Sequence, residues 1–206
     1  MIECSNVTCI RGDRVIFRNL SFSAADGSIT VVTGRNGSGK TSLLRAIVGL
    51  IPISFGTIKL NNEDISTLNT CISDITYIGH RSACHEHMST ADILELWANM
   101  RNNGDLVLAA VQFFGLEQVL NIKFSCLSSG WKKRVALARL LIFNTPVWVM
   151  DEPFANLDET STARVKDLIF TRAERGGIII LSEHSPENIF PDAPVVNLEQ
   201  FAVEQN

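Results

Sequence analysis

The chain has 206 residues, of which 46% are apolar and 19% charged. This composition indicates a folded globular protein with a sizeable core and excludes a disordered chain. The net charge of −4 gives no support for binding to nucleic acid. Apolar runs have strand length, far short of the roughly 20 residues that span a bilayer, and no signal peptide is expected. A role at a membrane would therefore need a separate membrane-spanning chain.

The first part of the chain favours strands. Asp26-Gly27 indicates a turn, and apolar and β-branched residues predict strands over residues 2–7, 15–17, 20–23, 29–33, 56–60 and 75–78. The five cysteines are scattered and odd in number, which favours reduced thiols in a reducing cytosol: Cys4, Cys9, Cys71, Cys84 and Cys126.

The later part alternates helices and strands. Thr90 is expected to cap a helix whose apolar positions include Ile93 and Trp97. Further helices are predicted over 106–114, 131–143 and 160–175, and strands over 147–150 and 178–181. We therefore expect one α/β domain over residues 1–206, with a mostly parallel core sheet, an N-terminal antiparallel β layer and a helical insertion over about 88–145.

A phosphate-binding loop follows the predicted strand 29–33. It reads Gly34, Arg35, Asn36, Gly37, Ser38, Gly39, Lys40 and Thr41, with Ser42 beginning the next helical pattern. The glycines let backbone N–H groups approach an anion, and the helix N-terminus adds partial positive charge. Lys40 can reach the β- and γ-phosphates, and the Thr41 hydroxyl can ligate Mg²⁺. The pattern predicts a nucleoside triphosphate site, and its context disfavours a glycine-rich turn without a ligand.

Acidic and basic side chains follow two later strands. Asp151 and Glu152 come at the end of strand 147–150, and His184 comes just after strand 178–181. Because ligands bind at the carboxyl ends of parallel strands, Asp151 is expected to hold Mg²⁺ and Glu152 to act as general base on water. His184 is expected to contact the γ-phosphate or the water. The alternatives are a solvated acidic loop and a structural histidine.

A second anion-binding segment precedes the basic helix. Ser128, Ser129 and Gly130 combine hydroxyls with a helix N-terminus. The chain then has two anion-binding segments, the phosphate loop and residues 128–130, but only one nucleotide loop. This is explained if residues 128–130 face the nucleotide of another copy across a twofold dimer. Read alone, the segment would be an ordinary serine cap.

The order of these motifs resembles the ATP-binding subunit of ATP-binding cassette (ABC) transporters. The phosphate loop, the Leu-Ser-x-Gly segment at 127–130, Asp-Glu-Pro at 151–153, Ala-Asn-Leu-Asp at 155–158 and His184 cover nearly the whole chain. The resemblance implies that Ser128, Ser129 and Gly130 close on the partner's ATP. It also places Asp158 between the two sites and makes His184 the switch histidine.

A narrower resemblance is to the haem exporter ATP-binding subunit of bacterial cytochrome c maturation. It rests on the strings 77–80, 134–140, 151–154 and 176–181. It implies an ATPase that drives haem transport or handling for c-type cytochrome biogenesis. It also implies a separate integral membrane permease as partner, with other cytochrome c maturation proteins as further candidate partners, and a peripheral position on the cytoplasmic face of the bacterial inner membrane.

Three positions depart from the common ABC pattern. His80 stands where glutamine is usual in a loop that senses Mg²⁺, although the narrower family also has histidine there. Trp131 ends the signature where glutamine is usual. The usual adenine-stacking aromatic is replaced near Arg11, whose guanidinium plane could stack on a purine or simply be solvated.

The segment 80–88 is expected to dock the membrane partner. Cys84, His85 and His87 could ligate a metal or haem iron, but they lack four-coordinate spacing, so docking is preferred. Arg81 and the two histidines are the side chains that we expect to contact the partner.

Other functions stay open from the sequence. The transporter could carry another substrate. A soluble ABC protein that acts on DNA or ribosomes would need a coiled coil, tandem cassettes or a basic face, none of which is evident. A P-loop kinase or GTPase would lack the Leu-Ser-x-Gly segment.

Overall fold

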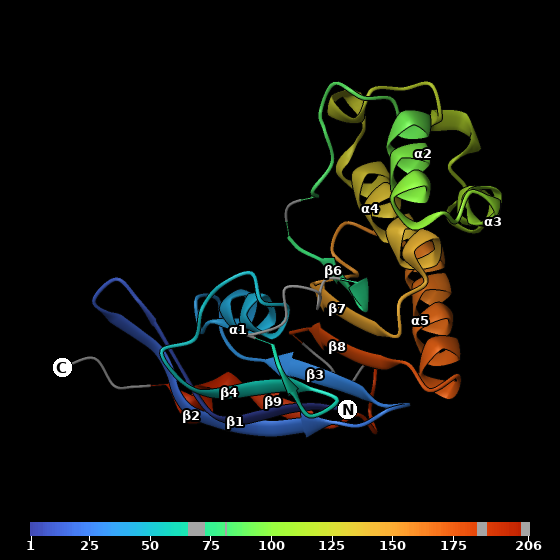
Figure 1. Ribbon diagram of the computed structural model, residues 1–206. Coiled ribbons are helices and arrows are strands. Elements are labelled where there is room, and N and C mark those ends of the chain that lie inside the picture. Colours follow the sequence, from blue (N-terminus) through green and yellow to red (C-terminus); the bar gives the residue numbers. More distant parts are fainter. Residues whose placement is uncertain (66–72, 81, 185–188, 203–206) are drawn as a thin grey trace.

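Two β-sheets organise the computed structural model, which describes residues 1–65, 73–80, 82–184 and 189–202 (Figure 1). One sheet is antiparallel, in the order β2-β1-β4-β5, from β1 (Ile2–Arg11), β2 (Arg14–Ala24), β4 (Phe55–Leu60) and β5 (Glu63–Asp64). The other is parallel, in the order β6-β7-β8-β3-β9, from β3 (Ile29–Thr33), β6 (Ile75–Ile78), β7 (Val147–Asp151), β8 (Ile178–Ser182) and β9 (Val195–Asn197). The predicted α/β fold with an antiparallel N-terminal layer is confirmed.

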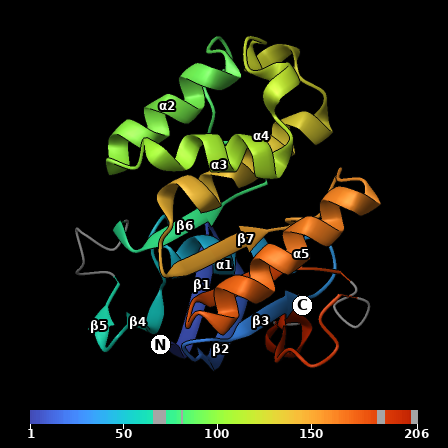
Figure 2. The same ribbon diagram turned by 90° about the vertical axis from the view of Figure 1, so that its right-hand side faces the viewer.

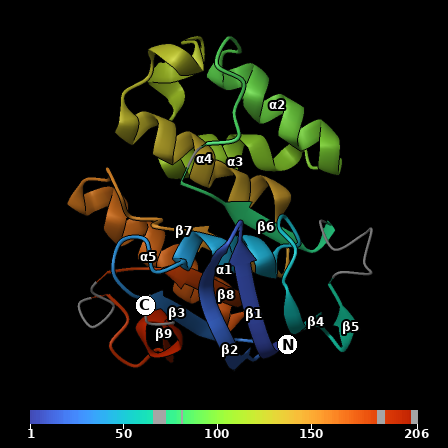
Figure 3. The same cartoon turned by 90° about the vertical axis from the view of Figure 1, so that its left-hand side faces the viewer.

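Helices cover the parallel sheet on both faces. The helix α1 (Lys40–Ile47) packs on β7 and β8 between the two sheets, and α5 (Glu159–Glu174) covers the opposite face (Figures 1 and 3). A lobe above the sheet contains α2 (Thr90–Arg101), α3 (Asp105–Phe114) and α4 (Ser129–Phe143), with short 3₁₀ turns at η2 (Glu117–Val119) and η3 (Phe124–Cys126) (Figure 2). A further 3₁₀ turn, η5 (Leu198–Phe201), follows β9. Among the described residues, no helix combines the length and apolar character needed to cross a membrane.

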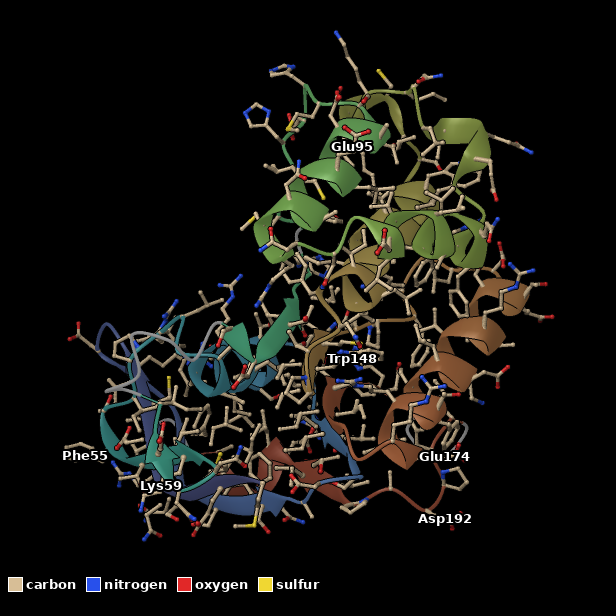
Figure 4. All side chains as sticks on the ribbon, turned by 45° about the vertical axis from the view of Figure 1, so that its right-hand side comes forward. Phe55, Lys59, Glu95, Trp148, Glu174 and Asp192 are labelled. Atoms are coloured by element: carbon tan, nitrogen blue, oxygen red, sulfur yellow. The ribbon has the colours of Figure 1, made fainter. Side chains whose placement is uncertain are left out.

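Alternate side chains of the parallel strands enter two hydrophobic cores. In β7, Val147 and Val149 pack with α1 and the antiparallel sheet, while Trp148 and Met150 pack with α5 and the helical lobe. Figure 4 shows Trp148 between the sheet and the helices. Every residue of β7 and β8 is buried, because both faces of a parallel sheet are covered. The polar side chains of β7 and β8 therefore lie at the ends of these strands.

The structure corrects the expected strand break, one helix cap and two helix starts. The strands expected at 15–17 and 20–23 are one strand, β2, because Asn19 adopts φ 55° at an irregularity and its N–H donates to Thr8 Oγ1 at 3.1 Å. Thr90 does not cap α2. Ser89 does, since its hydroxyl accepts from the Asp92 N–H while the Asp92 side chain accepts from the Ser89 N–H. The helices α1 and α4 also begin two residues earlier than expected, at Lys40 and Ser129.

Candidate active site

The carboxyl ends of four adjacent parallel strands meet at one edge of the sheet (Figure 1). The phosphate loop follows β3, Glu152 follows β7, His184 follows β8, and His80 follows β6. This edge is where open α/β sheets bind ligands. A cavity of about 360 Å³ lies here, lined by Ile16, Asn36, Gly37, Gly39, Lys40, Thr41, Ser42, His80 and Glu152.

The phosphate loop depends on Gly39 for its shape. Gly39 has φ 105° and caps the N-terminus of α1. A Cβ at Gly39 would lie 2.4 Å from Cγ2 of Ile16, closer than side chains tolerate. The left-handed backbone and the contact with β2 therefore both require glycine.

Lys40 is buried, with 7% of its surface exposed. Its Nζ donates to the carbonyl of Gly34 at 2.6 Å and to that of Arg35 at 3.2 Å. The loop curls around the ammonium and supplies these acceptors, which compensate for the loss of water. The cation is therefore held at the centre of the loop that would receive phosphate.

Asp151 connects the phosphate loop to β8. The Thr41 hydroxyl donates to its Oδ2 at 2.7 Å, and the Ser182 hydroxyl donates to its Oδ1 at 2.7 Å. Asp151 is 2% exposed and is paired in register with Ser182. A hydroxyl and a carboxylate at this distance form an oxygen donor set that suits Mg²⁺.

Glu152 has an unusual backbone conformation, with φ 46°. Its N–H donates to Ser182 Oγ at 2.9 Å, and its carbonyl accepts from Lys133 Nζ at 2.7 Å. Its Oε1 lies 3.2 Å from His184 Nε2, and its Oε2 lies 3.9 Å from His80 Nδ1. The structure thus brings Glu152, His184 and His80 together beside the phosphate loop.

Lys133 reaches this edge from α4. Burial lowers the pKa of Lys133 to about 8, while the charges of Asp151 and Glu152 oppose the shift. Sequence reasoning missed Lys133, Ser182 and Ile16. A basic residue near the start of a helix gives no signal that it points inward.

The signature segment lies away from the cavity of its own chain. Ser128 caps α4, accepting from the Trp131 N–H at 3.4 Å, and none of Ser128, Ser129 and Gly130 is among the described residues that line that cavity. Arg134 stacks 4.3 Å over Trp131.

Asp158 is joined to the signature helix rather than to the phosphate loop. It pairs with Arg134, Nη2 to Oδ2, at 3.2 Å and caps α5 by accepting from the Ser161 N–H at 2.7 Å. The hydrogen bonds from Ser161 lower the pKa of Asp158. A Cβ at Gly130 would lie 3.0 Å from the carbonyl of Asn156, so the two segments are also in close contact.

Arg11 and Glu199 remain to be placed relative to the phosphate loop. Arg11 is exposed at the end of β1, opposite Arg14, and the described cavity is lined by Ile16 instead. Glu199 of η5 accepts from the Arg35 N–H at 3.1 Å and pairs with its Nε at 3.3 Å. The C-terminal turn therefore braces the phosphate loop, a contact between distant segments that the sequence did not indicate.

The fold and site define an ATP-binding cassette, and residues 17–155 match the ABC transporter family. The chain belongs to this family. It is 45% identical over 202 residues to a "Cytochrome c biogenesis ATP-binding export protein CcmA" of Wolbachia pipientis, covering 98% of both chains. A protein with the same name from Paramagnetospirillum magneticum is 37% identical, over 98% of this chain and 95% of that one. The resemblance drawn from the motifs is confirmed.

Solved structures share the fold. A putative ABC transporter ATP-binding protein from Pyrococcus furiosus has a TM-score of 0.82 at 24% identity, covering 98% of this chain and 99% of that one. A dimeric ATP-binding cassette in a post-hydrolysis state, bound to ADP and Pi, has a TM-score of 0.86 at 22% identity, covering 100% and 97%.

Proposed function

We propose that this chain is the ATP-hydrolysing subunit of a membrane transporter complex that exports or handles haem for c-type cytochrome biogenesis. The name that the relatives carry supports the biological role, since the match runs over nearly the full length of both chains. The observation that carries the enzymatic part is the position of Glu152, whose carboxylate lies 3.2 Å from His184 and lines the same cavity as Lys40 and Thr41.

The proposed mechanism assigns one task to each group. Backbone N–H groups of residues 34–42 and the ammonium of Lys40 bind the β- and γ-phosphates of ATP. Thr41 and Asp151 would hold Mg²⁺, which neutralises phosphate charge when bound. Glu152 accepts a proton from the attacking water, and His184 orients the carboxylate and the γ-phosphate. His80 lies on the other side of Glu152 and would report on the same phosphate.

Hydrolysis would need two copies of the chain. Ser128, Ser129 and Gly130 stand at the start of α4, where hydroxyls and free N–H groups can bind an anion. They do not line the described cavity of their own chain, so we propose that they close on ATP held by a second copy. Asp158, paired with Arg134, would couple the two sites.

The membrane partner would dock beside β6. A groove of about 470 Å³ lies there, lined mostly by apolar side chains together with Tyr77, Gly79, Ala83 and Arg139. It adjoins the segment 80–88, in which His85 and His87 are exposed with ring centroids 5.9 Å apart. Arg81, also expected to take part, lies outside the described residues. This arrangement supports docking of a permease at the cytoplasmic face of the inner membrane.

Glu152→Gln tests the enzymatic proposal, because it keeps the shape of the side chain and removes the base. ATP hydrolysis should fall by about 10²–10⁴-fold while ATP still binds and holds a dimer in gel filtration. Cells that depend on this variant should lose c-type cytochromes, measured by haem staining. Hydrolysis at the parent rate would remove Glu152 as the base, and normal cytochrome assembly without any copy of this chain would remove the biological role.

A further inference from the structure

We propose that Lys133 is a positioning residue for ATP hydrolysis: it fixes the backbone of Glu152 and so aims the carboxylate at the attacking water. The inference rests on the proposed function, because it names the group that holds the proposed base. Lys133 itself touches no substrate atom in this scheme.

The contact is short and comes from another part of the fold. Lys133 lies on α4, and its Nζ donates to the carbonyl of Glu152 at 2.7 Å and lies 3.5 Å from that of Asp151. Lys133 is half-buried. A lysine ammonium that gives up water for two backbone carbonyls binds them strongly, because charge-assisted hydrogen bonds are the stronger kind.

The backbone of Glu152 adopts a conformation that needs stabilising contacts. Glu152 has φ 46°, a conformation that side chains other than glycine, asparagine and aspartate seldom adopt. Ser182 of β8 accepts from the Glu152 N–H at 2.9 Å, and Lys133 donates to the carbonyl of the same residue. Both polar backbone groups of Glu152 are thus bound by side chains from two other elements, which keeps the left-handed turn in place.

The backbone conformation of Glu152 determines where its carboxylate lies. With the backbone held in this way, Glu152 Oε1 lies 3.2 Å from His184 Nε2 at the edge of the cavity. An ordinary extended backbone would aim the side chain elsewhere. Lys133 also lies four residues after Ser129, on the same face of α4. The helix that presents the signature therefore holds the proposed base as well.

The alternative is that Lys133 only satisfies strand-end carbonyls and stabilises the fold. Kinetics separate the two roles. Lys133→Met removes the donor and keeps most of the length of the side chain, and Lys133→Arg keeps a donor. Lys132→Met is the matched control, since Lys132 is next on the same helix but donates to the Ser125 carbonyl at 3.2 Å, away from the site.

Lys133→Met should lower kcat by about 10- to 100-fold, the loss expected when a catalytic group is misplaced by about 1 Å, with the Kd for ATP within about twofold of the parent. Lys133→Arg should recover part of kcat, and Lys132→Met should match the parent. In a Glu152→Gln background, Lys133→Met should change the residual single-turnover rate by less than about twofold, because it acts through the missing base.

Three results would overturn the proposal. The first is a kcat of Lys133→Met equal to that of the parent, and the second is an equal loss of rate from Lys133→Met with Glu152 or Gln at position 152. The third is the same loss of kcat in Lys132→Met. If Lys133→Met does not fold, Lys133→Leu carries the same comparison, because leucine also lacks a donor. The proposed function fails separately, by an unchanged rate in Glu152→Gln. An inactive Glu152→Gln together with a fully active Lys133→Met would reject only the role of Lys133.

Discussion

Gly39→Ala should impair ATP binding more than Gly37→Ala, although each adds one methyl group to the phosphate loop. Two costs arise at this position. A φ of 105° strains any residue with a Cβ, by about 1–3 kcal/mol. The new Cβ would also lie 2.4 Å from Cγ2 of Ile16 and 3.3 Å from Phe17, and such overpacking costs about 1–3 kcal/mol. The Ile16 methyl cannot swing away, because it is attached directly to the branched Cβ of a strand residue.

The sum is about 2–6 kcal/mol, and the loop can avoid it only by leaving the shape that binds phosphate. The Kd for ATP should therefore rise by at least about 30-fold, which corresponds to about 2 kcal/mol. Gly37→Ala provides the comparison, because φ is 82° but nothing lies within 4 Å of its Cβ, so only strain remains. Gly12→Ala, with φ 59° in open space in the β1–β2 turn, should leave ATP affinity unchanged.

Isothermal titration with MgATP measures the affinities, and thermal unfolding checks the fold. A double variant tests the crowding directly: Ile16→Ala should recover part of the affinity lost in Gly39→Ala, compared with Ile16→Ala alone. Equal losses in Gly37→Ala and Gly39→Ala would refute the contact with Ile16. If Gly39→Ala binds ATP as tightly as the parent, both the backbone strain and the crowding against Ile16 would be refuted.

Two further experiments test the site and the fold around it. Lys40→Ala should weaken ATP binding sharply, and mixing it with Ser128→Arg should restore partial hydrolysis through the one intact composite site of the heterodimer; no recovery in proven heterodimers would reject shared sites. Burial raises the pKa of Cys84 to about 11. Its alkylation at pH 8 should be roughly 100-fold slower than for a thiol of pKa 9, rise about tenfold per pH unit up to pH 11, and lag behind exposed Cys126 in mass spectrometry. Equal labelling of the two thiols at pH 8 would contradict the burial of Cys84.

The sequence predicts most of the architecture because the two features that define an element, its apolar run and the turn residues beside it, are local. β3 and β6 have the expected bounds, since apolar runs between turn residues define them. The bend at Asn19 could not be predicted, because β2 continues through it on hydrogen bonds to β1. β9 and η5 were not expected at all. β9 is only three residues long and is stabilised by pairing with β3, about 160 positions earlier in the chain.

The same distinction applies to the candidate site. Lys40, Asp151, Glu152 and His184 are recognisable because each follows a strand in a known order of motifs. Lys133, Ser182 and Ile16 act by tertiary contact, and nothing in the spacing of the sequence relates position 133 to position 152. The contact of Glu199 with Arg35 joins residues 164 positions apart. Such supporting groups become visible only when the strands are in register.

Two cations of α4 attach the helical lobe to the edge of the parallel sheet that carries the candidate active site. Lys133 of α4 binds the carbonyl of Glu152 after β7, and Arg139 of α4 donates to the carbonyl of Tyr77 in β6 at 2.5 Å. Arg139 is also held over Trp97, 5.2 Å from the ring centroid, and burial lowers its pKa. Because the two cations lie six residues apart, less than two helical turns, α4 cannot rotate or slide without disturbing at least one strand end. A partner that moves the lobe would therefore act on the backbone at Tyr77, at Glu152 or at both, which gives the proposed motor a direct connection between its docking side and its base.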